Sequence, residues 1–325
     1  MTTRPLPTFP ITETVPAIRA ALAEGRSLVL TAAPGAGKTT IVPLALLDEE
    51  WLAGKRLLML QPRRVAALSS ARRLASLHGS RLGDTIGYQV RFDRRIGPST
   101  RLEVLTEGLL TRRLHDDPFL EGVGLVIFDE FHERSLQADL GLAMAREIQQ
   151  TVRPDLRILV MSATLDPGPL QRFLAPCPSL EGKGFLHPVT RIWSLKFPGP
   201  DFCRAAAETA IRELSADPLR GDLLIFLPGA GEIARTQDLL AESPATREID
   251  LVPLHGSLPL DRQEEALRPS GKRRIIISTN ISETSLTIEG VTSVVDAGWC
   301  RLLRLDPATG LEKLQLERIS KASAE

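Results

Sequence analysis

The stretch of residues 28–40 constrains the fold of this chain most, because an apolar run leads there into a loop of small residues. The loop ends in Lys38, Thr39 and Thr40. The string fits the pattern G-x-x-x-x-G-K-[ST], except that Ala32 holds the first glycine position. We expect Ala32 to be harmless if its φ is negative. The pattern predicts a buried strand, a phosphate-binding loop and a helix in direct succession.

Small residues let the backbone N–H groups of such a loop turn inward around a phosphate, and the following helix N-terminus adds partial positive charge. We expect Lys38 to reach the β- and γ-phosphates of a nucleotide and the Thr39 hydroxyl to bind Mg²⁺. The alternative is an ordinary glycine-rich turn, which the Lys-Thr-Thr sequence after Gly37 disfavours. The candidate nucleotide-binding residues are Ala33, Pro34, Gly35, Ala36, Gly37, Lys38, Thr39 and Thr40.

Length and composition set broad limits. A chain of 325 residues, 43% of them hydrophobic and 25% charged, is typical of about two globular domains. The first residues include no apolar signal segment, and no stretch is apolar and long enough to span a membrane. Three scattered cysteines argue against a disulfide framework. These features predict a cytoplasmic protein. The formal net charge is zero, so a nucleic-acid partner would have to be bound by local basic patches.

Apolar strands alternate with helical segments along most of the chain, which predicts an α/β fold with parallel sheets. We expect residues 1–14 to be irregular and two domains to span residues 15–180 and 181–325. A Pro- and Gly-rich stretch, 167–188, is the candidate linker between them. Near the end, residues 300–305 and 311–316 flank a turn closed by Gly310, which predicts a β-hairpin.

A second acidic motif provides candidates for hydrolysis. The apolar run at 124–128 ends in Asp129 and Glu130. Asp129 is expected to hold Mg²⁺, and Glu130 to orient and deprotonate an attacking water. The alternative is an acidic pair that only ends a strand. The phosphate loop about ninety residues earlier, in the same α/β unit, disfavours that alternative.

Together with further motifs, these two make the chain resemble the DEAH-box RNA helicases over nearly its whole length. The resemblance is greatest to the bacterial HrpB-type branch. The motifs occur in the family's order: APGAGKTT (33–40), QPRRVAA (61–67), TEGLL (106–110), DEFH (129–132), SAT (162–164), LIFLPG (224–229) and STNISETSLTIEG (278–290). The resemblance implies two tandem RecA-like P-loop NTPase domains, with ATP and Mg²⁺ in the cleft between them and single-stranded RNA, or DNA, across both. It also implies a monomer.

The resemblance also implies roles for individual residues. Glu130, Lys38 and His132 would be catalytic, and Arg73 would cover one face of the nucleotide base. Arg63, Arg64 and Thr106 from the first domain, and Thr279 and Asn280 from the second, would contact nucleic acid. Ser162 and Thr164 would couple the phosphate state to domain closure, and the hairpin would guide or separate strands. Spacing alone favours a solvated helix face for Arg63 and Arg64, and the resemblance reverses that preference in favour of RNA contact.

One departure from the family concerns an arginine-rich motif, QRAGRAGR, which the resemblance would place directly after ISKASAE, where the printed sequence stops. We therefore expect a truncated core that binds nucleotide but is weakly active or inactive as an ATPase. Three functions stay open: an RNA-stimulated helicase motor, a nucleotide-gated RNA clamp with little turnover, and, least favoured, a metabolic P-loop kinase.

Overall fold

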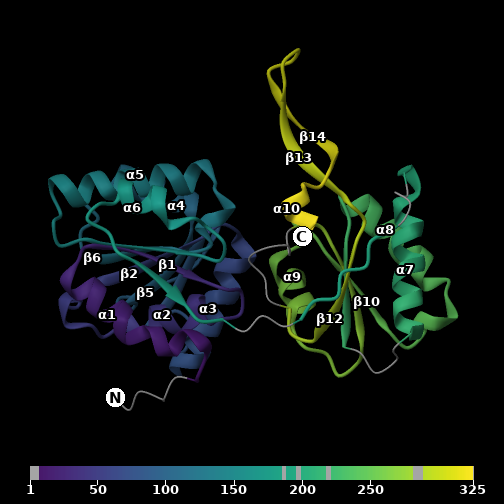
Figure 1. The fold of residues 1–325 in the computed structure, drawn as a ribbon, viewed down its shortest axis with the longest axis horizontal. Helices are drawn as coiled ribbons and strands as arrows, with labels where there is room; N and C mark the ends of the chain where they lie inside the picture. The colour runs from purple at the N-terminus through teal and green to yellow at the C-terminus, as the bar shows by residue number, and fades with distance from the viewer. Residues whose placement is uncertain (1–6, 185–187, 195–198, 217–220, 281–287, 325) are drawn as a thin grey trace. The chain divides into compact units, whose positions relative to one another are not determined.

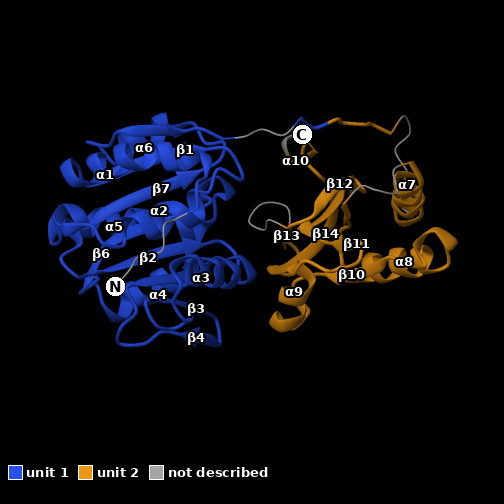
Figure 2. Ribbon diagram, turned by 90° about the horizontal axis from the view of Figure 1, so that it is seen from below, with its two compact units in different colours: residues 1–189 blue, residues 190–325 orange. Residues whose placement is uncertain are grey.

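The computed structural model describes residues 7–184, 188–194, 199–216, 221–280 and 288–324. The chain divides into two compact units, residues 1–189 and 190–325, which Figure 2 colours separately. The expected division at 180/181 falls inside strand β8 (Ser179–Gly182). That strand pairs with β1 (Ser27–Ala32) and therefore belongs with the first unit. None of the described helices is long and apolar enough to cross a membrane.

The described part of unit 1 is built on an eight-stranded sheet in the order β4-β3-β5-β2-β6-β7-β1-β8. Neighbouring strands pair in parallel, except that β3 and β4 are antiparallel. The remaining strands of this sheet are β2 (Arg56–Gln61), β3 (Ile86–Val90), β4 (Asp93–Arg95), β5 (Leu102–Thr106), β6 (Val123–Phe128) and β7 (Arg157–Ser162). The carboxyl ends of the parallel strands consequently meet at one edge of the sheet.

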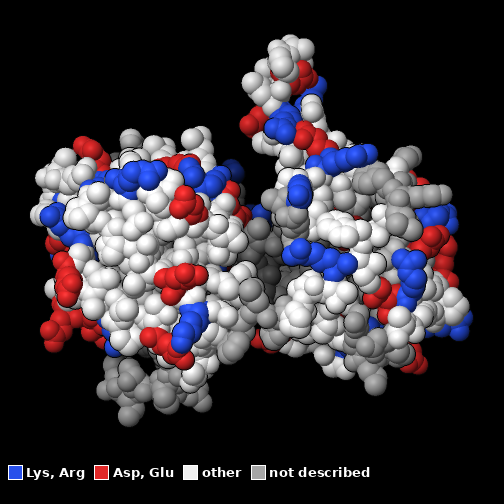
Figure 3. Space-filling model, viewed as in Figure 1, with Lys and Arg blue, Asp and Glu red and all other residues white. Residues whose placement is uncertain are grey.

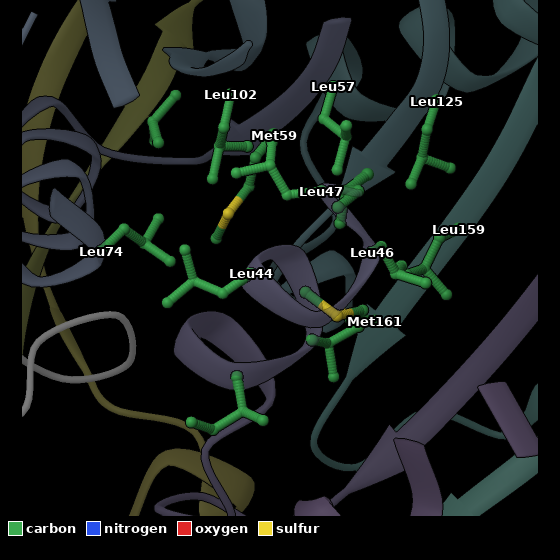
Figure 4. Close-up of a cluster of buried hydrophobic side chains, with 14 of the residues drawn as sticks. Leu44, Leu46, Leu47, Leu57, Met59, Leu74, Leu102, Leu125, Leu159 and Met161 are labelled. Atoms are coloured by element: carbon green, nitrogen blue, oxygen red, sulfur yellow. The ribbon is translucent and has the colours of Figure 1, made fainter. Parts of the chain in front are cut away.

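Helices cover both faces of this sheet (Figure 1). One layer contains α1 (Val15–Glu24), α2 (Lys38–Leu46) and α3 (Arg64–His78), and the other contains α4 (Glu107–Asp116), α5 (Leu136–Thr151) and α6 (Pro167–Phe173). Figure 4 shows part of the first layer's core, where leucines of α2 and α3 meet apolar side chains from β2, β5, β6 and β7. The central strands β1, β2, β6 and β7 are buried on both faces, which is why their sequences are almost continuously apolar.

Unit 2 repeats the design on a smaller scale. Four of its described strands form a parallel sheet in the order β10-β11-β9-β12. Its elements are α7 (Phe202–Ala216), β9 (Asp222–Phe226), α8 (Ala230–Ala241), β10 (Asp250–Leu254), α9 (Leu260–Leu267), β11 (Arg274–Ser278), β12 (Val291–Asp296) and α10 (Lys321–Ala324). The antiparallel hairpin of β13 (Trp299–Asp306) and β14 (Leu311–Arg318) projects from this unit (Figure 1). The predicted α/β fold and its hairpin are thus confirmed.

Two predictions about irregular segments were wrong. The stretch 167–188, expected to be a linker, contains helix α6 and strand β8, because Asp166 caps the helix and β8 adds to the open edge of β1. The N-terminal stretch is also partly ordered: residues Pro10–Thr14 form a 3₁₀ helix, η1, in which Ile11 is fully buried. In both cases tertiary contacts override a composition that is typical of loops.

Candidate nucleotide site

The polar residues predicted to act on a nucleotide gather at the carboxyl edge of the unit 1 sheet. The phosphate loop follows β1, Asp129 follows β6, and Ser162 ends β7. Because β1, β7 and β6 are neighbours in the sheet, their ends lie side by side. Such edges are where open parallel sheets bind ligands.

The loop after β1 is a tight turn that depends on two glycines. Gly35 and Gly37 have φ values of 75° and 90°, which glycine adopts without a steric penalty. The N–H of Ala36 donates to the carbonyl of Ala33 at 3.2 Å, which closes the turn. Helix α2 begins directly after Gly37. Ala32 is the last residue of strand β1 and is not among the residues with a positive φ, so the backbone condition set for it is met.

Lys38 extends from the first position of α2 into the sheet edge. Its side chain is almost completely buried, and its Nζ lies 3.2 Å from Glu130 Oε1. A buried ammonium is costly unless it is paired, so the carboxylate of Glu130 stabilises it in this structure. An anionic ligand on the loop would offer Lys38 a second partner.

Asp129 is the most buried charged group of the site, with 1% of its surface exposed. Its Oδ2 accepts hydrogen bonds from Thr39 Oγ1 and from Gln61 Nε2, both at 2.7 Å, and its Oδ1 accepts from the Glu130 N–H at 3.0 Å. Burial raises the pKa of Asp129, while the charge of Lys38 and these hydrogen bonds act in the opposite direction. No role was predicted for Gln61, although it begins the motif QPRRVAA and is a polar residue at the carboxyl end of a buried strand.

These contacts fit a hard divalent cation. The Thr39 hydroxyl and the Asp129 carboxylate, predicted to bind Mg²⁺, are within hydrogen-bond distance of each other. Mg²⁺ sites typically use one or two such oxygens together with phosphates and water. Among the described residues, no group of three or more His, Cys, Asp or Glu side chains could hold a metal by itself. Thr39 and Asp129 are therefore the described residues here that could contribute oxygen ligands to a cation.

Glu130 and His132 complete the site. Glu130 has a left-handed backbone, with φ of 52°, which turns the chain sharply after β6. Burial, and then the negative charge of Asp129, raise the pKa of Glu130 to about 7. Its Oε2 lies 3.4 Å from His132 Nδ1. Burial lowers the pKa of His132, which favours the neutral ring. A carboxylate with a raised pKa beside a phosphate loop suits a general base.

The segment after β7 contacts the same motif. The N–H of Ala163 donates to His132 Nδ1 at 3.5 Å. The Ser162 hydroxyl is buried and accepts from the N–H groups of Thr164 and Leu165 at 3.3 and 3.1 Å. The side chain of Thr164 is exposed. Ser162 thus fixes the turn that contacts His132.

The predicted nucleic-acid residues of unit 1 lie on the same edge of the sheet. Arg63 precedes α3 and forms an ion pair with Glu133, with 3.3 Å between Nη2 and Oε2. Arg64 is exposed on the first turn of α3, and Thr106 is the N-cap of α4. Basic and acidic side chains are interspersed on the surface that Figure 3 shows, which agrees with the neutral net charge. Glu133 was not identified from the sequence.

The remaining candidates are more dispersed. Arg73 is exposed on α3. In unit 2, Thr279 and Asn280 follow β11, and the N–H of Thr279 donates to the carbonyl of Leu254 at 3.2 Å. The middle of the expected motif 278–290, residues 281–287, lies outside the described residues. The roles of these residues stay predictions.

Comparisons with known proteins agree with the two-unit division. The model of the DEAD/DEAH box helicase family matches residues 12–173, and that of the helicase conserved C-terminal domain matches residues 207–306. Among curated proteins, the chain is 47% identical over 320 residues to the ATP-dependent RNA helicase HrpB of Escherichia coli (strain K12). It is 36% identical over 319 residues to a probable ATP-dependent RNA helicase, a DHX35 homolog, of Caenorhabditis elegans.

The matches cover nearly all of this chain but less than half of the relatives. The Escherichia coli protein is matched over 97% of this chain and 39% of its own length, and the Caenorhabditis elegans protein over 92% and 43%. A crystal structure of Escherichia coli DEAH/RHA helicase HrpB superimposes with a TM-score of 0.87 at 45% identity, over 97% of this chain and 40% of that one. The similarity therefore concerns the part of those proteins that corresponds to these two units.

Proposed function

The chain belongs to the DEAD/DEAH-box helicase family, and from this premise we propose that it is the motor part of an ATP-dependent RNA helicase. In this proposal it hydrolyses ATP at the carboxyl edge of the unit 1 sheet, and binding of single-stranded RNA accelerates the hydrolysis. The observation that carries the proposal is the buried contact of Lys38 with Glu130, next to Thr39 and Asp129.

We propose that ATP binds with its phosphates on the loop at 33–37. The loop N–H groups and the N-terminus of α2 would bind the β-phosphate, and Lys38 would exchange part of its contact with Glu130 for the β- and γ-phosphates. Thr39 and Asp129 would hold Mg²⁺, which when bound neutralises phosphate charge. Gln61 donates to Asp129 and would keep that carboxylate oriented.

Release of Glu130 from Lys38 would give it a catalytic role. A carboxylate freed from its ammonium partner can accept a proton from a water molecule aligned with the γ-phosphate. The neutral ring of His132, within 3.4 Å of Glu130, would limit the positions that the carboxylate adopts. Ser162 would act through the Ala163 N–H, which contacts the same ring. Lys38 is thus proposed to act as a ligand of the phosphates, and Glu130 as the general base.

Arg63, Arg64 and Thr106 are proposed to bind the RNA backbone, as are Thr279 and Asn280 of unit 2. The position of Arg63 supports this role, because its partner Glu133 directly follows His132 in the chain. A phosphate that competes with Glu133 for Arg63 would disturb the motif that contains the general base. Such competition would link RNA binding to hydrolysis within unit 1. Arg73 as a base contact, a monomeric state and a cytoplasmic location remain part of the proposal.

The test is ATP hydrolysis by the 325-residue chain, measured with and without single-stranded RNA. We expect RNA to raise the rate of hydrolysis and Glu130→Gln to remove both the basal and the stimulated rate. If RNA changes only the affinity for ATP and leaves the rate unchanged, the chain is a nucleotide-gated clamp. Transfer of the γ-phosphate to a small molecule instead of water would show a kinase.

A further inference from the structure

A short N-terminal segment, residues 9–12, lies directly against the phosphate loop. The N–H of Ile11 donates to the carbonyl oxygen of Ala36 at 3.0 Å. The side chain of Ile11 is fully buried. Neither Phe9 nor Ile11 falls within the matched helicase region, which begins at residue 12. This contact joins parts of the chain that are about 25 residues apart.

The contact fixes the orientation of one peptide group of the loop. A trans peptide is planar, so the carbonyl of Ala36 and the N–H of Gly37 point in opposite directions. A hydrogen bond that holds the Ala36 oxygen toward Ile11 therefore directs the Gly37 N–H away from η1. Gly37 immediately precedes Lys38, so its N–H is one of the donors that the loop offers to a phosphate.

Phe9 supports the same peptide by packing. A Cβ on Gly37 would lie 2.8 Å from both Cβ and Cγ of Phe9, so the phenylalanine side chain touches the bare Cα side of the glycine. Gly37 has a φ of 90°, and a glycine can also leave such a conformation easily. Packing by Phe9 restricts that freedom from outside the loop.

The segment is itself well anchored. The N–H of Phe9 donates to Thr12 Oγ1 at 3.0 Å, and the N–H of Thr12 donates to the Phe9 carbonyl at 2.9 Å. The side chain of Ile11 packs on Gly182 of β8 so closely that a Cβ there would collide with it. Strand β8 pairs with β1, the strand that leads into the loop. The segment is thus attached to the same sheet edge as the loop it contacts.

We propose that residues 9–12 form a brace that holds the Ala36–Gly37 peptide with its N–H directed at the nucleotide's phosphates. Phe9 and Ile11 are positioning residues, since they touch the loop and not the ligand. The inference rests on the proposed function, because it requires that the loop binds phosphates. Without the brace, this peptide can rotate and present its carbonyl oxygen, which repels an anion.

The brace acts on phosphate recognition alone. Its removal should therefore lower the affinities for ATP and for inorganic tripolyphosphate by the same factor. We expect Phe9→Ala to weaken the binding of both about tenfold, the lower end of the value of one lost hydrogen bond to a charged group. Phe9→Leu, which retains an apolar side chain over Gly37, should restore most of the affinity. Ile18→Val is the control, because Ile18 is fully buried in α1 within the same core. It should lower stability without changing either affinity.

The experiment measures tripolyphosphate and ATP affinities by calorimetry and follows the ¹H–¹⁵N signal of Gly37 during each titration. The proposal predicts that the Gly37 signal shifts on tripolyphosphate binding in the unchanged chain and shifts less in Phe9→Ala. Thr12→Val, which removes only the hydroxyl that accepts from Phe9, should have the same effect to a smaller degree and serves if Phe9→Ala does not fold. If the unchanged chain does not bind tripolyphosphate, the proposed function fails. If it binds and Phe9→Ala binds equally well with an unchanged Gly37 signal, the brace is refuted.

Discussion

The tetrapeptide Pro-Gly-Ala-Gly occurs twice in this chain, and the two copies adopt different structures. Residues 34–37 lie between β1 and α2, whereas residues 228–231 follow β9 and run into the first turn of α8. In the first copy both glycines have positive φ and the helix starts only after Gly37. In the second, Gly229 is extended with φ of −168°, and the helix already starts at Ala230. Only in the first copy do all four residues lie outside the following helix.

The residues next to each copy account for the difference. Lys38 follows the first copy, whereas Glu232 follows the second and forms an ion pair with Arg301 at 2.7 and 2.9 Å. The Arg301 guanidinium lies so close to Gly229 that a Cβ there would collide with it. A side chain of the protein therefore covers the α8 N-terminus. In the first copy, the N–H of Ile11 donates to the carbonyl of Ala36 instead, and Phe9 lies against Gly37. The conformation of this short glycine motif thus depends on the residues that follow it and on the side chains that contact it.

The largest expected effect is on the rate of ATP hydrolysis, and it distinguishes the proposed general base, Glu130, from the residues proposed to bind the phosphates. Glu130→Gln preserves the shape of the side chain but removes the proton acceptor, so ATP should still bind. Hydrolysis should fall about 10²- to 10⁴-fold, the usual contribution of a general base. Single-turnover measurements at saturating ATP test this directly. A rate within a few fold of the unchanged chain would assign the base to another residue.

The same alanine substitution should have opposite effects in the two copies. Gly37→Ala places a side chain at a positive φ and against Phe9, which should destabilise unit 1 by about 1–3 kcal/mol. Gly231→Ala lies in the first turn of α8 with open space around it, and should stabilise unit 2 by about 0.5–1 kcal/mol. Thermal melting of each variant tests both signs. Equal shifts would mean that the two loops do not differ as described.

A further difference between the units concerns charge. The proposed RNA contacts of unit 1 include Arg63 and Arg64, whereas those of unit 2 are the neutral Thr279 and Asn280. Each lost phosphate contact lowers the log–log salt slope of binding by about 0.7 for a single strand. Replacing both arginines by alanine should therefore flatten the slope by about one to two units. Alanines at Thr279 and Asn280 should lower affinity and leave the slope unchanged. An unchanged slope in the arginine variant would move the RNA path elsewhere.

The sequence predicts those features that depend on neighbouring residues, and it does not predict those that depend on contacts between residues far apart in the chain. The loop at 33–38 and the pair Asp129-Glu130 have local patterns, and the regular strands and helices have local periodicity. The contact of Ile11 with Ala36 has no such signal, because a backbone N–H leaves no trace in residue type. Helix α6 and strand β8 were missed because proline and glycine suggested a linker. The different fate of the second Pro-Gly-Ala-Gly copy depends on Arg301, about seventy residues away in sequence.

The most direct test of the central claim is the affinity for ATP of three variants, measured at equilibrium. Lys38→Ala should weaken binding roughly 10- to 100-fold, the value of a hydrogen bond to a charged group. Glu232→Gln, at the matching position of the second copy, and Glu130→Gln should both bind ATP close to the unchanged chain. If Glu232→Gln lowered the affinity for ATP as much as Lys38→Ala does, the assignment of the nucleotide to the unit 1 loop would be contradicted. If Glu130→Gln bound ATP no better than Lys38→Ala, the assignment of Glu130 as the base would be contradicted.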